Sequence, residues 1–238
     1  MLFIIYASLI SFVGTFVVMP SVIKLAIKKR ILTRGGGRNS HEGFTPNIGG
    51  IAIFIGLLLS NLFLLGYYIK AQNALGSIID VNSLDKFLSY IIVTVSCIVM
   101  FIVGLSDDLT SLSSRVRFFI QLIVAFCLTY FGDIRIESLS GLFGIYEIPY
   151  ILSIIFSIIV VIFIINSFNL TDGLDALATT LGFFILSSFG VLFLLSEHYY
   201  DATLCFAGVS SLFAFWFYNK PPAKIFMGDS GSLVIGVI

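Results

Sequence analysis

Long apolar runs separated by short polar segments set the pattern of this chain. A transmembrane helix needs about 20 mostly apolar residues to cross the hydrocarbon core of a bilayer. We predict seven complete spans and the start of an eighth, at Met1–Ile27, Ile51–Ile69, Phe87–Ser106, Phe118–Phe131, Tyr150–Ile165, Leu177–Leu195, Ala202–Phe217 and Leu233–Ile238. The pattern indicates an all-α, polytopic membrane helix bundle. No linker divides residues 1–238, so we expect a single integral-membrane domain.

Two stretches depart from this pattern. In the 133–149 loop, Ile134-Arg-Ile-Glu, two glycines and Tyr146-Glu-Ile follow one another, which is typical of a small β-hairpin. The last apolar run, from Leu233, has only six residues and is too short to cross a bilayer. We therefore expect the chain to be a fragment that is incomplete at its C-terminus.

Composition and charge placement predict the environment and the orientation. Hydrophobic residues make up 58% of the chain and charged residues 11%, whereas soluble domains carry about a quarter charged residues. We therefore expect a multi-pass protein that lies in a lipid bilayer. Ten of the 13 Lys and Arg lie at or after the ends of the first, third, fifth and seventh spans. Because cytoplasmic loops carry the excess of Lys and Arg, these loops are predicted to be cytoplasmic and the N-terminus external. The net charge of zero says nothing about nucleic acid, and the charge asymmetry between the loops is the informative quantity. We expect no nucleic-acid partner.

Four short polar segments interrupt the apolar pattern, and all of them fall on the predicted cytoplasmic side. They are His41–Gly50, Phe101–Leu109, Asn166–Asp175 and Phe226–Ser232. An ionisable residue at the end of a span is costly unless it faces water, a cation or a partner. We therefore expect these segments to form one functional site at the cytoplasmic interface.

Asp107 and Asp108 end the third span as a pair. Two adjacent carboxylates favour a divalent cation, a basic partner or a shared proton, and Mg²⁺ prefers oxygen ligands. The alternative is an N-cap for a helix that starts near Leu109, although one aspartate would serve for that. Arg115 and Arg117 follow on the same side, either as phosphate ligands or as ordinary cytoplasmic charges.

Four polar side chains recur at intervals of three in the next segment: Asn166, Asn169, Asp172 and Asp175. In a helix they would share one face, and in a loop that turns at Gly173 they would line it. Either way two amides and two carboxylates converge. Their oxygens suit a metal ion or a nucleotide, and the alternative is a purely structural network.

The other two segments are rich in glycine. Phe226 offers a stacking face to a base, and glycines on both sides of Asp229 allow close approach of the backbone to a ligand; a simple helix start is the alternative. Thr45-Pro46 predicts a turn, and Gly49-Gly50 predicts a close approach at the start of the second span. The basic residues just upstream suit phosphate binding.

In this order, the four segments resemble the polyprenyl-phosphate N-acetylhexosamine-1-phosphate transferases, a family of multi-span enzymes. The family includes the initiators of bacterial O-antigen (lipopolysaccharide), enterobacterial common antigen and teichoic acid synthesis, and the muramoyl-pentapeptide transferases are a related branch. The matching motifs are His41 with Thr45-Pro46-x-x-Gly49-Gly50, Gly104-Leu105-x-Asp107-Asp108, Asn166-x-x-Asn169-Leu-Thr-Asp172-Gly-Leu-Asp175 and Phe226-Met-Gly228-Asp229-x-Gly-Ser232.

The resemblance implies transfer of an N-acetylhexosamine-1-phosphate from a UDP-amino sugar such as UDP-GlcNAc to undecaprenyl (polyprenyl) phosphate, with release of UMP. This step initiates the synthesis of cell-surface glycans. The implied cofactor is Mg²⁺, with Mn²⁺ as a substitute. Carried over residue by residue, the implied groups are catalytic Asp107, Asp108, Asp172 and Asp175; metal-binding Asp229 and Asn169; and nucleotide- or phosphate-binding Phe226, Gly228, Asp175, Arg117, Asn166, His41 and Thr45.

Within these groups, Asp107 and Asp108 would orient or deprotonate the lipid phosphate, and a covalent phospho-aspartate stays open. The chain departs from the family pattern in three places. Ala176 stands where a second glycine is usual, and Arg117 stands where a lysine is frequent. The chain also ends before the family's histidine-containing loop. Ser111, in place of a lysine, disfavours the muramoyl-pentapeptide branch.

Two other classes of protein serve as alternatives. An ion-coupled transporter also carries acids in its spans, but its sites lie near the bilayer midplane. A CDP-alcohol phosphatidyltransferase is disfavoured because the motif Asp172-Gly-Leu-Asp175 lacks the Ala-Arg pair of that class. We expect a UDP-amino sugar and a polyprenyl phosphate as partners, and a homodimer stays open.

Overall fold

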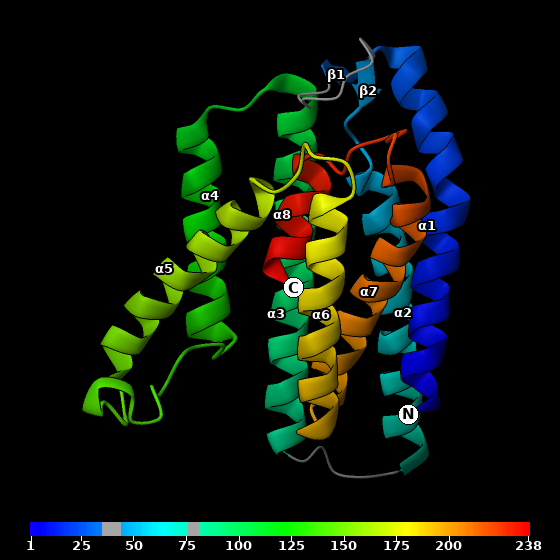
Figure 1. The fold of residues 1–238 in the computed structure, drawn as a ribbon. Helices are drawn as coiled ribbons and strands as arrows, with labels where there is room; N and C mark the ends of the chain where they lie inside the picture. The colour runs from blue at the N-terminus through cyan, green and yellow to red at the C-terminus, as the bar shows by residue number, and fades with distance from the viewer. Residues whose placement is uncertain (35–43, 76–80) are drawn as a thin grey trace.

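The computed structural model describes residues 1–34, 44–75 and 81–238, and within these ranges the chain folds into long helices (Figure 1). The elements in chain order are α1 (Leu2–Lys29), β1 (Leu32–Arg34), β2 (Phe44–Pro46), α2 (Gly50–Leu75), α3 (Val81–Thr110), α4 (Ser114–Phe126), η1 (Cys127–Phe131), η2 (Leu142–Gly144), α5 (Tyr150–Asn169), α6 (Leu177–Leu195), α7 (Tyr199–Asn219) and α8 (Asp229–Val237). The π-helical turn η1 continues α4, and η2 is a 3-10 turn.

Seven helices in the described ranges are long and apolar enough to cross a membrane, which confirms the predicted polytopic helix bundle. Several helices begin earlier than their apolar runs, among them α4 at Ser114 and α8 at Asp229. In α4, the side chain of Ser113 accepts a hydrogen bond from the amide of Val116 at 3.4 Å. Because such a cap satisfies an unpaired amide, the helix can start on polar residues.

The prediction of a β-hairpin in the 133–149 loop is wrong. These residues are all described and contain no strand, and the chain reverses at the 3-10 turn η2. The amide of Ile136 donates to Ser157 Oγ at 2.8 Å, and its carbonyl accepts from Ser153 Oγ at 2.7 Å. Since α5 side chains bind the backbone groups that a strand ladder would use, the alternating pattern does not produce a sheet.

Helix α8 lies at the centre of the bundle, in contact with α2, α3 and α5 (Figure 1). Its residues 230–235 are buried. A Cβ atom at Gly104 of α3 would clash with the carbonyl of Asp229, and one at Gly50 of α2 would clash with the backbone of Gly231. These glycines therefore bring two helices onto the first turn of α8, which confirms the close approach predicted at the start of the second span.

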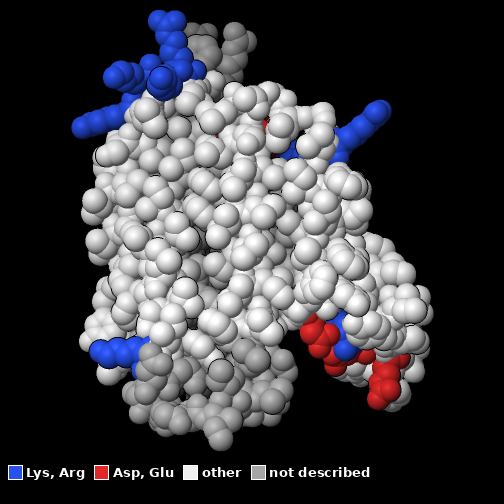
Figure 2. All heavy atoms as spheres, turned by 180° about the vertical axis from the view of Figure 1, so that it is seen from behind, with Lys and Arg blue, Asp and Glu red and all other residues white. Residues whose placement is uncertain are grey.

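The two ends of the bundle differ in charge. The connections after α1, α3, α5 and α7 lie at the same end as the antiparallel pair β1–β2 (Figure 1). Figure 2 shows most of the visible Lys and Arg side chains gathered at this end, and Asp and Glu gathered near the opposite end. The described parts of all four polar segments therefore share the basic end of the bundle.

Candidate active site

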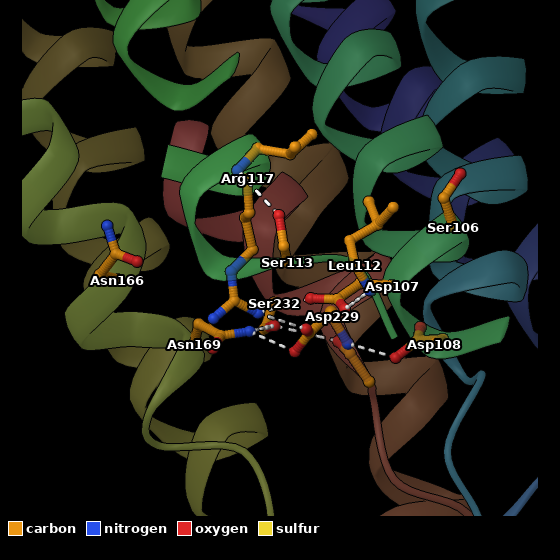
Figure 3. A network of polar contacts seen from close by, with 12 residues as sticks. Ser106, Asp107, Asp108, Leu112, Ser113, Arg117, Asn166, Asn169, Asp229 and Ser232 are labelled. Carbon is orange, nitrogen blue, oxygen red and sulfur yellow. Dashed lines mark hydrogen bonds and ion pairs between the residues drawn. The ribbon is translucent and has the colours of Figure 1, made fainter. Parts of the chain in front are cut away.

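Three charged side chains from three helices meet at the basic end of the bundle (Figure 3). Asp107 lies in the last turn of α3, Arg117 in the first turn of α4, and Asp229 is the first residue of α8. A single nitrogen, Nη1 of Arg117, lies 2.6 Å from Asp107 Oδ2 and 2.8 Å from Asp229 Oδ2. Their side chains are between 12% and 27% exposed, so the cluster is reachable from solvent yet largely shielded from it.

A fourth helix supplies an amide to the same carboxylate. Asn169 is the last residue of α5, and its Nδ2 donates to Asp229 Oδ1 at 2.6 Å and to Ser232 Oγ at 2.7 Å. Burial raises the pKa of the Asp229 carboxyl and the adjacent Asp107 carboxyl adds to this, while Asn169 and Arg117 oppose it. Both oxygens of Asp229 are thus engaged, which fixes its orientation.

Asp108 binds the start of α8 instead of joining the charged cluster. Its carboxylate accepts hydrogen bonds from the amides of Asp229 and Ser230, each at 2.9 Å. The first amides of a helix lack partners within it, and a negative charge is favourable at this end of the helix dipole. Because α3 continues through both aspartates, the alternative of a cap for a helix near Leu109 is wrong. Asp108 caps α8.

Asp172 and Asp175 hold the connection that leads from α7 into α8. Asp172 accepts from the amide of Gly228 at 2.7 Å and from that of Met227 at 3.4 Å. Asp175 accepts from the amide of Ala223 at 3.1 Å. Burial raises the pKa of Asp172, and its backbone hydrogen bonds oppose the shift. Both carboxylates therefore shape the backbone from which Asp229 projects.

The motif with intervals of three is divided between a helix and a loop. Asn166 lies about one turn deeper in α5 than Asn169, apart from the Asp229 cluster (Figure 3). Its Nδ2 donates to Gln121 Oε1 at 2.9 Å and to the carbonyl of Ile162 at 2.8 Å. The predicted convergence of four polar side chains is wrong, because α5 ends at Asn169 and the aspartates bind the α7–α8 connection instead. Of the four side chains of this motif, Asn169 is the one that the structure brings to Asp229.

Phe226 is anchored through its backbone by Pro46 and Gly49, which precede α2. Its amide donates to the carbonyl of Pro46 at 2.8 Å, and its carbonyl accepts from the amide of Gly49 at 3.0 Å. Its side chain is only 7% exposed. Thr45 precedes this contact in β2, whereas His41 lies outside the described residues.

Gly228 has a φ of 75°, in the left-handed region that favours glycine. A Cβ atom there would clash with the carbonyl of Asn47 and come within 3.0 Å of the carboxylate of Asp108. The predicted close approach at this glycine is thus to the backbone of Asn47 and to the Asp108 carboxylate that caps α8, and not to a ligand.

Gln121 is the polar residue of this region that sequence reasoning missed. It lies in α4, one turn after Arg117, and is 1% exposed. The signal was an amide within an otherwise apolar run, four residues after a predicted site residue, a spacing that places both on one helix face.

The donor set of the cluster suits Mg²⁺. This ion binds proteins through one or two carboxylates and completes its shell with water and substrate phosphates. The carboxylates of Asp107 and Asp229 both contact Nη1 of Arg117, so a positive charge at that position is stabilised by both. Asn169 offers an amide oxygen once its terminal amide is turned over. Among the described residues, no group of three or more His, Cys, Asp or Glu is placed so that it could hold a metal ion.

Comparison with known proteins decides the family. The model of glycosyl transferase family 4 matches residues 90–238, which include the α3, α5 and α8 parts of the site. The chain belongs to glycosyl transferase family 4. The resemblance read from the four polar segments is thereby confirmed.

Members of this family match the chain over nearly its whole length. The probable undecaprenyl-phosphate N-acetylglucosaminyl 1-phosphate transferase of Bacillus subtilis is 30% identical and covers 99% of the chain. The phospho-N-acetylmuramoyl-pentapeptide-transferases of Listeria innocua and Prochlorococcus marinus are 30% and 31% identical and cover 97% and 98% of it. The chain spans 61%, 70% and 62% of the length of these three relatives, in that order.

The ion-coupled transporter is not favoured. The relatives above are named as transferases. Asp107, Asp108 and Asp229 also cluster at one end of the helices, whereas transporter sites lie near the bilayer midplane.

Proposed function

We propose that this protein transfers an N-acetylhexosamine-1-phosphate from a UDP-sugar to undecaprenyl or another polyprenyl phosphate and releases UMP. The observation that carries the proposal is the meeting of Asp107, Arg117, Asn169 and Asp229, from four helices, at one end of a membrane bundle. Attack of one phosphate on another is repulsive, so catalysis depends on positive charge and alignment. A membrane surface is also where a lipid phosphate and a soluble nucleotide sugar meet.

In this reaction an oxygen of the lipid phosphate forms a bond to the phosphorus that carries the sugar. The bond from that phosphorus to the bridging oxygen of UMP breaks, and UMP leaves with the electron pair. Bound Mg²⁺, or Mn²⁺ in its place, supplies charge neutralisation at the pyrophosphate. Asp229 and Asn169 would hold the metal, and the guanidinium of Arg117 pairs with phosphate oxygens, a geometry that arginine suits.

The two adjacent aspartates divide their roles in this proposal. Asp108 is occupied by two amides of α8, so it positions Asp229. Asp107 instead accepts hydrogen bonds from Arg117 and from the amide of Leu112, the latter at 2.7 Å. Asp107 is therefore the member that orients or deprotonates the lipid phosphate, and direct displacement needs no phospho-aspartate.

We assign the nucleotide to the α7–α8 connection. Phe226 stacks on uracil, Asp175 bonds to the edge of the base, and Asp172 keeps the Gly228 amide in place. Because Phe226 is buried, with 7% of the residue exposed, stacking requires movement of its ring. His41 and Thr45 remain predicted phosphate ligands. Asn166 binds Gln121 and Ile162, so it takes no direct part here.

The remaining parts of the proposal concern the setting. The protein lies in the inner (plasma) membrane. The basic end of the bundle faces the cytoplasm, because cytoplasmic loops carry the excess of Lys and Arg. Ser111 replaces the lysine of the muramoyl-pentapeptide branch, which supports a simple UDP-amino sugar as the donor. The product then starts a cell-surface glycan. A homodimer stays a prediction.

The test is a donor panel. The protein as its gene encodes it is purified in detergent and supplied with Mg²⁺ and undecaprenyl phosphate. UDP-GlcNAc, its epimers and UDP-MurNAc-pentapeptide are added one at a time, and UMP release is measured. We expect release with a UDP-N-acetylhexosamine and none with the pentapeptide donor. If well-folded protein releases no UMP with any of these donors, the proposal is refuted. If it releases UMP with UDP-MurNAc-pentapeptide alone, the protein acts as a muramoyl-pentapeptide transferase instead.

A further inference from the structure

Gln121 and Asn166 form a buried amide pair between α4 and α5. Gln121 Nε2 donates to Asn166 Oδ1 at 3.4 Å, and Asn166 Nδ2 donates to Gln121 Oε1 at 2.9 Å. The Gln121 side chain is 1% exposed. In the described part of the chain, no other side-chain hydrogen bond joins these two helices. In each of the two side chains, the amide nitrogen thus donates to the partner and the amide oxygen accepts from the partner.

The pair lies about one helical turn deeper in the bundle than the charged cluster. Gln121 follows Arg117 by one turn of α4, and Asn166 precedes Asn169 by about one turn of α5, so each member shares a helix face with a residue of the site. Arg117 Nη1 lies 2.8 Å from one oxygen of Asp229, and Asn169 Nδ2 lies 2.6 Å from the other. A rotation or slide of α4 against α5 would therefore break one of these two contacts.

A specific polar contact is needed to fix the packing of α4 against α5. They lie to one side of the bundle (Figure 1), and large apolar side chains such as Phe119, Phe156 and Phe163 are exposed on them. In a bilayer the hydrophobic effect does not drive helices together, and interhelical hydrogen bonds help to fix their packing. A buried amide left without its partner is costly, so the pair favours one register of α4 on α5.

We propose that Gln121 and Asn166 are positioning residues for the transfer reaction. Their amide pair holds α4 against α5 so that Arg117 and Asn169 reach the two oxygens of Asp229 at the same time. Asn169 is a proposed metal ligand, whereas Arg117 competes with the metal for Asp229, so the weaker Mn²⁺ binding expected below comes from displacement of Asn169. The inference rests on the proposed function for its effect on turnover. Its effect on the divalent-cation site is independent of which sugar is transferred.

The experiment compares four variants with the unaltered protein. Gln121→Leu and Asn166→Leu each leave one amide without its partner. The double variant Gln121→Leu/Asn166→Leu replaces both amides by apolar groups of similar size, which is nearly neutral for stability. The swap Gln121→Asn/Asn166→Gln keeps one long and one short amide and restores the pair.

A matched control removes a polar contact elsewhere in the membrane region. Asn61 of α2 accepts a hydrogen bond from the Tyr90 hydroxyl of α3, and it lies three turns away from the end of α2 that meets α8. Asn61→Leu thus removes an interhelical hydrogen bond without touching α4 or α5. Each protein is assayed for Mn²⁺ binding by electron paramagnetic resonance without substrate, for UMP release and for its thermal unfolding midpoint.

We expect the double leucine variant to unfold near the temperature of the unaltered protein, yet to bind Mn²⁺ and to release UMP about tenfold less well, the effect typical of losing a residue that orients metal ligands. The swap should recover both properties, and Asn61→Leu should leave both unchanged. The inference is overturned if the double variant keeps unaltered Mn²⁺ affinity and turnover, or if its losses merely follow a lower unfolding midpoint.

The outcomes also separate this inference from the proposed function. If the unaltered protein releases no UMP but the double variant weakens Mn²⁺ binding and the swap restores it, the proposed reaction fails and the positioning role stands. If UMP release is normal in every variant, the positioning role fails and the reaction stands. An unaltered protein that neither releases UMP nor binds Mn²⁺ refutes both.

Discussion

At the scale of single residues, Arg117 decides the electrostatics of the site. One of its nitrogens bridges Asp107 and Asp229, at 2.6 Å and 2.8 Å. Without this cation, two shielded carboxylates would face each other, which disfavours ionisation of both. Arg117 thus holds the position where Mg²⁺ is proposed to bind, and the metal must displace it toward the substrate phosphates.

Substitution of Arg117 should therefore separate metal binding from turnover. Arg117→Gln removes the competing cation, so we expect Mn²⁺ affinity without substrate to rise several-fold. UMP release should fall by roughly a hundredfold, because a charge that stabilises the transition state is lost. Arg115→Gln is the matched control, since Arg115 is exposed two residues earlier in α4, and it should change neither property. Weaker Mn²⁺ binding by Arg117→Gln would contradict the assigned role.

Asp172 gives a prediction for the pH dependence of stability. Burial raises its pKa in the folded protein, so the folded state binds this proton more tightly than the unfolded chain. The resulting stabilisation is complete below the ordinary aspartate pKa of about 4 and is lost as the pH rises through the raised folded value. Asp172→Asn cannot ionise, so it lacks this dependence.

We expect the unfolding midpoint of the unaltered protein to fall relative to that of Asp172→Asn as the pH rises from about 4 upward. Thermal unfolding in detergent over a series of pH values measures the difference. A difference that stays constant, or that changes in the opposite direction, would show that the environment of Asp172 is not the one described.

At the scale of elements, the first turn of α8 is the critical junction. This helix begins at Asp229, and the first amides of a helix need partners from outside the helix. Asp108 supplies the cap through two amides, each at 2.9 Å. The orientation of a metal ligand is thus coupled to a carboxylate in a different helix.

Asp108→Asn should lower the free energy of unfolding by about 1 kcal/mol, because the charge at the helix N-terminus and one acceptor are lost. Asp107→Asn is the matched comparison, since Asp107 does not bind α8 amides. It removes one ion pair with Arg117 but also relieves the repulsion between Asp107 and Asp229, so it should change the free energy of unfolding by less than Asp108→Asn does, while lowering UMP release more strongly. Denaturant unfolding in detergent and the UMP assay measure both effects. Equal destabilisation by the two substitutions would contradict the division of roles.

Helix α2 offers a matched pair of glycines for testing the packing of the bundle. A Cβ atom at Gly56 would clash with Thr15 Oγ1 and lie 2.5 Å from the carbonyl oxygen of Ser11, whereas one at Gly66 would meet nothing within 4 Å. We expect Gly56→Ala to destabilise the protein by about 1–3 kcal/mol. Gly66→Ala should stabilise it by up to about 1 kcal/mol, because alanine favours the helix. Equal effects would contradict the close contact of α1 and α2.

At the scale of the whole molecule, the sequence predicted the features that depend on local composition. Long apolar runs specify spans wherever they occur, and the seven spans were confirmed. The hairpin after η1 failed because Ser153 and Ser157, on the next helix, bind its backbone. That contact depends on tertiary packing, which the alternating pattern does not encode.

The same limit explains what was missed in the site. Adjacent residues of a helix point about 100° apart, so Asp107 and Asp108 face different neighbours. Which one meets Arg117 and which one caps α8 depends on where those helices lie. Gln121 was missed for the same reason, because its partner Asn166 is 45 positions away along the chain.

The most direct test of the proposed site is Mg²⁺-dependent UMP release by Asp229→Asn, measured beside the unaltered protein with undecaprenyl phosphate and the best UDP-amino sugar. Asp201→Asn is the control, since Asp201 lies in the first turn of α7, at the opposite end of the bundle. We predict that Asp229→Asn loses at least about a hundredfold of the release, while Asp201→Asn stays near the unaltered rate. Unchanged Mg²⁺-dependent release by Asp229→Asn would contradict the site described here.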